Sequence, residues 1–249
     1  MRQLLWATLS VGLIVGASTR GIAQDDAKDV IKKAIEASGG AEKIDKYKGS
    51  KSTGKGSIQI QGLDLEFTSE SVTMFPDKSK EVIKMDVMGQ TITIEQKQIG
   101  DKSSLTVNGM AMDLPDAMKE EMKQSSTYEA VQRLTPLLSD AEFKLKSLGA
   151  SKIDGKDVTG IEVGGKGLKE VKLFFEKSTG LILQAERRGF DPTGMKEVKQ
   201  VMKFLEYKEV NGLKKPWKVS VTNDGQKFME ATTTEMKLLE KVDDKEFSD

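Results

Sequence analysis

The chain has 249 residues with 39 basic and 39 acidic side chains, so its formal net charge at pH 7 is +0. This balance gives no electrostatic basis for binding nucleic acid, because basic side chains must neutralise the phosphates. There is no histidine and no cysteine, which excludes Ser-His and Cys-His catalysis, thiol chemistry and metal sites that use either residue. We therefore expect no catalytic residues, no metal site, no cofactor and no nucleic-acid partner.

Two pairs of adjacent acids, Glu120-Glu121 and Asp243-Asp244, are the remaining candidates for acid-base chemistry. The two carboxyl groups of a glycosidase face each other across the substrate, whereas neighbours in sequence do not. We expect these acids to be solvated surface residues, and the protein not to be an enzyme.

The N-terminus has the pattern of an export signal. Arg2 is followed by an apolar run over residues 4–15 and then by small residues up to Ala23, which is the order of a secretory signal peptide. The apolar run is shorter than the roughly 20 residues that span a bilayer, so an uncleaved anchor is the weaker alternative. We predict a signal peptide over residues 1–23, cleaved after Ala23 or after Gln24.

The mature chain, residues 24–249, contains no linker or low-complexity tract, and we expect it to form one domain. No later segment is long and apolar enough to span a membrane, and no cysteine near the cleavage site could accept a lipid. A chain of this length can bury a core without disulfides. We expect a soluble monomer in the periplasm or another extracytoplasmic compartment.

Helical patterns occur in two places. In residues 25–37 apolar side chains recur on one face, and Gly39-Gly40 can end the helix. Between residues 114 and 138, Pro115 can begin one helix and a capping box at residues 126–129 can begin another. We predict an N-terminal helix and one or two short helices inserted in the middle of the chain.

From residue 50 onward apolar and polar residues alternate, which is typical of strands with one face on a core and the other in water. A phase slip between Phe67 and Val72 suggests a bulge. Turn residues separate the strands at a spacing typical of hairpins; they are Gly62, Pro76-Asp77, Gly89-Gln90, Gly100-Asp101, Asn108-Gly109, Asp154-Gly155, Gly164-Gly165, Thr179-Gly180, Asn211-Gly212 and Asp224-Gly225. We predict eleven or twelve strands in a mainly antiparallel α+β fold.

Apolar residues on the predicted strands and around the inserted helix are the candidates for a ligand cavity. The set comprises Ile58, Ile60, Leu65, Phe67, Ile83, Met85, Ile92, Ile94, Met110, Met112, Met118 and Met122. Methionine is flexible and polarizable, so the four methionines suit a surface that accepts varied apolar shapes, although they can equally fill gaps in a core. The strand residues line a core in a closed fold and a cavity in an open one.

Several segments resemble a known family. They are Ala37-Ser38-Gly39-Gly40 leading into Tyr47-Lys48-Gly49, the strand pair from Leu173 to Leu181, the hairpin from Glu206 to Gly212 followed by Lys215-Pro216-Trp217, and the terminal Asp243-Asp244-Lys245-Glu246-Phe247. Together they are similar to the periplasmic outer-membrane lipoprotein-sorting family, called LolA/LolB-like. The resemblance implies an open, incomplete LolA-like β-barrel with short helices over its concave face.

The same resemblance implies a function. It suggests a soluble carrier that binds the acyl chains of lipoproteins or lipids in an apolar concave cavity, with a membrane-bound donor or acceptor protein as a further partner. Because relatives of this fold also act as sensors, the alternative is a non-catalytic sensor or interaction domain that binds a protein of the cell envelope.

Overall fold

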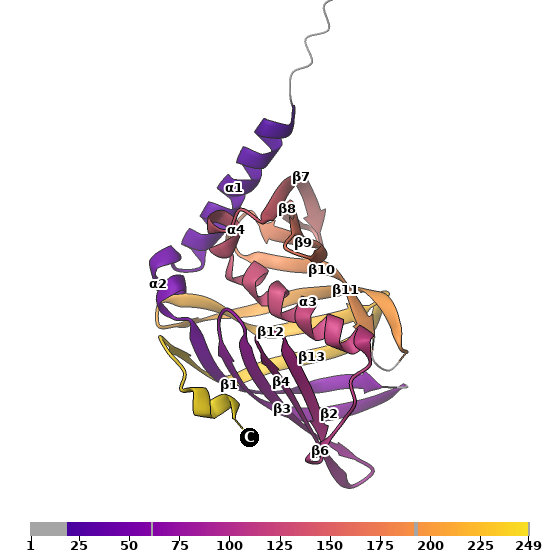
Figure 1. Cartoon of the computed structure of the whole chain (residues 1–249). Coiled ribbons are helices and arrows are strands. Elements are labelled where there is room, and N and C mark those ends of the chain that lie inside the picture. Colours follow the sequence, from indigo (N-terminus) through magenta and orange to yellow (C-terminus); the bar gives the residue numbers. More distant parts are fainter. Residues whose placement is uncertain (1–18, 61, 192–193, 249) are drawn as a thin grey trace, which may run out of the picture.

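The computed structural model describes residues 19–60, 62–191 and 194–248. Its strands form one antiparallel sheet that curls without closing (Figure 1). Within the described residues the helices are α1 (Thr19–Ala37), α2 (Ala41–Lys46), α3 (Asp116–Arg133) and α4 (Pro136–Ser139), and a 3-10 turn, η1 (Asp244–Phe247), follows the last strand. This architecture confirms the predicted open, mainly antiparallel fold.

The described part of the sheet contains 13 strands in the order β6-β5-β4-β3-β2-β1-β13-β12-β11-β10-β9-β8-β7. They are β1 (Gly49–Ile60), β2 (Leu63–Met74), β3 (Lys78–Val87), β4 (Gln90–Ile99), β5 (Lys102–Val107), β6 (Met110–Ala111), β7 (Phe143–Ile153), β8 (Lys156–Gly165), β9 (Leu168–Glu176), β10 (Ile182–Asp191), β11 (Lys196–Val210), β12 (Leu213–Asn223) and β13 (Gln226–Leu239). The pairing of β1 with β13 joins the two halves of the chain. The inserted helix α3 crosses the concave face (Figure 1).

The main hydrophobic core lies where α1, α3 and α4 pack on the C-terminal half of the sheet. Ile31 of α1, Val131 of α3 and Leu173 of β9 are completely buried there, and each such side chain stabilises the fold by about 1.5–3 kcal/mol. On β1 to β5, in contrast, no apolar side chain among the described residues is fully buried, and Phe67 and Met85 are the buried ones, at 8% and 7% exposure. The inner face of these strands is therefore free to border a cavity.

The prediction of the inserted helices was partly wrong. The capping box at residues 126–129 does not begin a helix, because α3 runs through it. The Thr127 hydroxyl instead donates to the carbonyl of Lys123, one turn earlier, at 3.3 Å, an alternative that such residues use inside helices. The helix ends at Arg133, because the next residue, Leu134, has a φ of 67°, and Pro136 begins α4.

Four details of the strand prediction were also wrong. The turn expected at Gly89-Gln90 lies at Met88-Gly89, since Gln90 begins β4. There is no bulge between Phe67 and Val72, because β2 pairs with both neighbours in unbroken register there. The inward-facing residues of β2 instead change from apolar to polar along the strand. When only apolar residues are followed, this change resembles a shift of the alternation by one residue. The turn expected at Gly164-Gly165 lies at the next two residues, and the short strand β6 raises the count of described strands above the predicted eleven or twelve.

Most of the predicted signal peptide, residues 1–18, lies outside the described residues. The bond after Ala23 falls within α1, which begins at Thr19. Among the described residues, no helix is long and apolar enough to cross a membrane.

Candidate functional site

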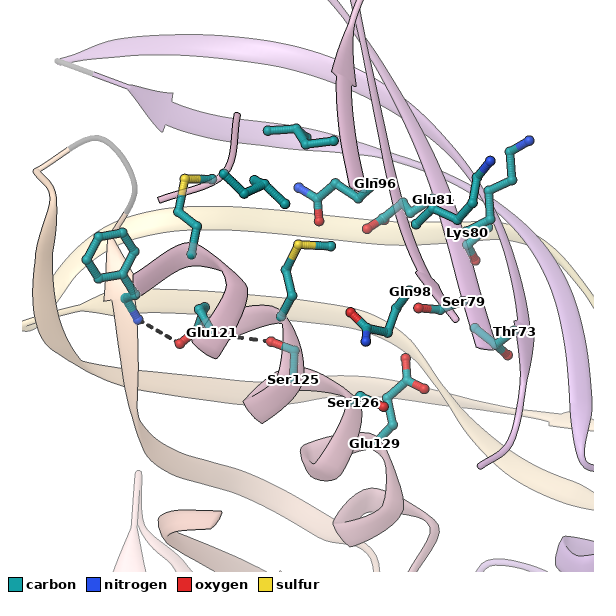
Figure 2. Close-up of a pocket in the computed structure, with 17 residues that line it drawn as sticks. Thr73, Ser79, Lys80, Glu81, Gln96, Gln98, Glu121, Ser125, Ser126 and Glu129 are labelled. Atoms are coloured by element: carbon teal, nitrogen blue, oxygen red, sulfur yellow. Dashed lines mark hydrogen bonds between the residues drawn. The ribbon is translucent and has the colours of Figure 1, made fainter. Parts of the chain in front are cut away.

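A cavity of about 390 Å³, named here the first cavity, lies between α3 and the inner face of β2 to β5 (Figure 2). Its apolar lining consists of Leu105, Leu114, Met118, Met122 and Phe190. Its polar lining includes Ser71, Thr73, Ser79, Glu81, Gln96, Gln98, Ser126 and Glu129. Because an α-helix rises 1.5 Å per residue, Met118 and Glu129 are separated by roughly 16 Å along α3. The first cavity is therefore amphipathic, with an apolar end at the start of the helix.

The register of the sheet explains why polar residues face the cavity. Glu81 of β3 lies opposite Ser71 of β2 and Gln96 of β4, and side chains directly opposite each other share one face. The alternate residues Lys80 and Lys97 therefore point to the other face, as Figure 2 shows for Lys80. Their ammonium groups lie 3.4 and 3.6 Å from the carboxylate of Glu95. Both lysines border the first cavity, but their charges are paired with that of Glu95.

Two carboxyl groups at the polar end have shifted pKa values. Burial raises the pKa of Glu81, which has no hydrogen bond or ion pair within the described residues. Glu129 is exposed, but the protein atoms close around its carboxyl group reduce the hydration of that group. This desolvation and the nearby charge of Glu81 raise the pKa of Glu129 to about 7, against the opposing effect of Arg133. Near neutral pH the polar end can therefore donate as well as accept hydrogen bonds.

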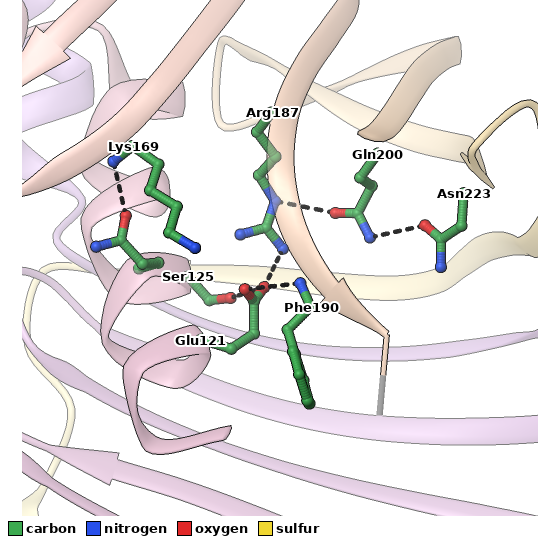
Figure 3. Close-up of polar contacts among 8 residues, drawn as sticks. Glu121, Ser125, Lys169, Arg187, Phe190, Gln200 and Asn223 are labelled. Carbon is green, nitrogen blue, oxygen red and sulfur yellow. Dashed lines mark hydrogen bonds and ion pairs between the residues drawn. The ribbon is translucent and has the colours of Figure 1, made fainter. Parts of the chain in front are cut away.

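The first half of α3 is fastened to β10 by a polar cluster (Figure 3). The Glu121 carboxylate accepts hydrogen bonds from the guanidinium of Arg187 at 2.6 Å and from the backbone N–H of Phe190 at 3.0 Å. Arg187 also donates to Gln200 at 2.9 Å and lies over the ring of Tyr128 at 5.2 Å. The expectation that Glu121 is a solvated surface acid was wrong, because the sequence gives no sign that Arg187 lies beside it.

Buried polar contacts hold α3 at two further points. The amide of Gln124 donates to the carbonyl of Gly167 at 2.8 Å and accepts from the N–H of Lys169 at 3.0 Å. At the end of α3, Arg133 donates to the carbonyls of Ile44 and Tyr47. The helix that covers the cavity is therefore held to β8–β9 and to α2 as well as to β10.

The structure brings only some of the predicted ligand residues together at this cavity. Met118 and Met122 line it, and the exposed Met110 and Met112 precede α3. The eight strand residues all lie on the sheet face that carries Glu81. Residues directly opposite each other share a face, and the register pairs Ile58 with Leu65, Phe67 with Met85, Met85 with Ile92 and Ile83 with Ile94. Ile60 lies on the same face because it follows Ile58 by two residues. Phe67 and Met85 border a separate shallow hollow. None of the eight strand residues lines the first cavity, so their role in ligand binding stays a prediction.

Sequence reasoning missed the polar lining because it followed apolar residues only. The two-residue alternation of each strand could have revealed it. Ser71 and Thr73 are an even number of residues from Phe67, as Glu81 is from Ile83, so each shares the inner face of its strand with that apolar residue. The same strands thus change from an apolar to a polar inner face along their length. Within the described chain, no group of three or more acidic side chains could hold a metal ion.

No family model matches the sequence, and no curated protein matches it. Solved structures do match the fold. A LolA superfamily protein from Nitrosomonas europaea aligns at 14% identity over 90% of this chain and 97% of its own, with a TM-score of 0.57. A putative outer membrane lipoprotein-sorting protein domain from Vibrio parahaemolyticus aligns at 13% identity with the same coverages and a TM-score of 0.54.

A DUF1329 family protein from Desulfovibrio piger also aligns, at 14% identity over 89% of this chain and 97% of its own, with a TM-score of 0.53. Each of the three matches covers about nine tenths of this chain. TM-scores of 0.53 to 0.57 at these low identities demonstrate a shared fold and nothing more. The curled open sheet crossed by α3 agrees with this fold. The chain therefore has the LolA-like fold that the sequence resemblance predicted.

Proposed function

We propose that this protein is a non-enzymatic carrier outside the cytoplasm that binds an acyl chain of a lipid or lipoprotein in the first cavity. The observation that supports this most is the apolar end of the cavity, where Met118 and Met122 face Leu105 across the space between helix and sheet. Each methylene buried there contributes about 0.8 kcal/mol. A volume of about 390 Å³ is at the lower end of ligand sites and suits a single chain.

The shared fold supports the proposal, since one similar structure is described as a lipoprotein-sorting domain. The predicted signal peptide supports a location outside the cytoplasm. The contacts of the first half of α3 also fit a carrier, because polar contacts at Glu121 and Gln124 hold this half of the helix beside the apolar end of the cavity.

A displacement assay with a fluorescent dodecanoate tests the proposal. The double variant Met118→Asn/Met122→Asn places amides at the apolar end, and we expect it to weaken binding at least tenfold. The matched control, Met88→Asn/Met195→Asn, changes two methionines that are 92% and 57% exposed and should bind like the wild type. Absence of binding by the wild type would reject the carrier and favour the interaction domain.

A further inference from the structure

A second cavity, of about 350 Å³, lies beneath the C-terminal half of α3. It adjoins the first cavity, because Thr73 and Glu129 line both. Its floor is apolar and comes from strands in the other half of the sheet, with Ile182 of β10, Phe204 of β11 and Leu213 of β12.

The charges that face this second cavity are mostly positive. Lys48, Arg133, Lys214 and Lys215 line it, against a single acid, Glu129. Lys48 is exposed, and Lys214 has its own partner, the carboxylate of Glu209 at 3.1 Å. Lys215 is half-buried and has no hydrogen bond or ion pair within the described residues.

Arg133 is the second cation without an ion pair among the described residues, although the charges of Asp45 and Glu129 favour its protonated form against the effect of burial. Its guanidinium donates to the neutral carbonyl of Tyr47 at 3.2 Å and lies over the ring of Phe75 at 4.8 Å. Its Nε is buried and has no partner among the described residues. Burial together with the charge of Arg133 lowers the pKa of Lys215 to about 8. Two partly desolvated cations that repel each other are unfavourable unless an anion lies between them.

We propose that the second cavity binds the anionic head group of an amphiphile, a carboxylate or phosphate, between Lys215 and Arg133, with the apolar floor covering the adjoining methylenes. The inference deepens the proposed function by naming the head group of the ligand, and it rests on that function for the presence of an acyl chain. Charge-assisted hydrogen bonds to the anion would offset the lost hydration of both cations. Binding should tighten as the pH falls from 8 to 6, because Lys215 gains a proton and Glu129 loses its charge.

The test compares dodecanoate with its methyl ester, which has the same chain without the charge, in the full-length protein at pH 6.5. We expect the wild type to bind the acid about tenfold more tightly than the ester, Lys215→Gln to lose this preference and Lys215→Arg to keep it. The control variant Lys214→Gln changes the neighbouring, ion-paired lysine and should keep the preference as well.

A second readout is the pKa of Lys215 after reductive ¹³C-methylation, followed by NMR. Dodecyl phosphate should raise this pKa, and inorganic phosphate should do so only at a far higher concentration; equal potency of the two would overturn the amphiphile in favour of a free anion. Equal binding of acid and ester by the wild type, or a preference that survives in Lys215→Gln, overturns the head-group site. Tight binding of both ligands that is unaffected by Met118→Asn/Met122→Asn instead overturns the acyl site of the proposed function.

Discussion

Glu121 of α3 and Arg187 of β10 form an ion pair at 2.6 Å, with only 20% and 13% of their side chains exposed. Glu121 lies one turn from Met118, and its carboxylate also accepts a hydrogen bond from the N–H of Phe190. The pair therefore positions Met118 and Phe190, two apolar residues of the cavity, relative to each other. The apolar end of the first cavity thus depends on a polar contact for its shape.

Replacing Arg187 with Gln leaves the partly buried carboxylate of Glu121 without its cation. We expect the free energy of unfolding to fall by about 1–3 kcal/mol, measured by urea denaturation. Hydrogen exchange of the first turns of α3 should accelerate in the same variant, because the helix loses its contact with β10.

The matched control for that experiment is Lys169→Gln. Lys169 forms an ion pair of the same length, 2.6 Å, with Glu197, but the two side chains are 46% and 49% exposed. Exposed pairs contribute about 0.2–1 kcal/mol, so this variant should change stability little. Equal losses in the two variants would contradict a structural role for Glu121 and Arg187 beyond ordinary surface charge.

The raised pKa of Glu129 gives the stability a pH dependence. The pKa of about 7 in the folded chain lies above the ordinary glutamate value of 4.5, so folding favours the protonated carboxyl. The resulting stabilisation is fully present below about pH 4.5 and is lost as the pH rises through 7. Glu129→Gln has a neutral side chain at every pH and should remove this loss of stability. Because Glu129 is exposed to solvent, we expect the loss to be no more than about 1 kcal/mol.

Thermal unfolding of wild type and Glu129→Gln at pH 5 and pH 8 measures the effect. We expect the wild type to lose more stability than the variant between the two pH values. The exposed Glu235 of β13 offers the control, since Glu235→Gln makes the same charge change away from both cavities. A wild type and a Glu129→Gln variant with parallel pH profiles would show that Glu129 titrates as a solvated acid.

Gly56 of β1 is required by close packing within the sheet. A Cβ at this position would lie 2.1 Å from the carbonyl oxygen of Glu230 and 2.8 Å from the ring of Phe67. Gly56→Ala should therefore destabilise the fold by about 1–3 kcal/mol. The control is Gly164→Ala, where nothing lies within 4 Å of the added atom, and it should change stability by less than about 1 kcal/mol. If chemical denaturation shows a larger loss for Gly164→Ala than for Gly56→Ala, the close packing at Gly56 is contradicted.

Local signals explain why most strands could be predicted from the sequence. The Asn211-Gly212 turn, for example, has both residues at positive φ, which this dipeptide favours in a tight hairpin. The site depends instead on contacts between distant residues. Glu121 and Arg187 are 66 residues apart in the chain. Arg133 and Lys215 line the same cavity only because α3 crosses the sheet. The two-residue alternation of a strand indicates which of its residues share a face. It does not indicate that a helix covers the face that carries Glu81.

The most direct test of the acyl site is a crystal structure with 12-bromododecanoate, in which anomalous scattering locates the bromine at the end of the chain. The carrier proposal predicts a bromine peak in the first cavity, beside Met122. Bromine found only on the outer surface of the sheet, or no ordered bromine in crystals grown at saturating ligand, would contradict it.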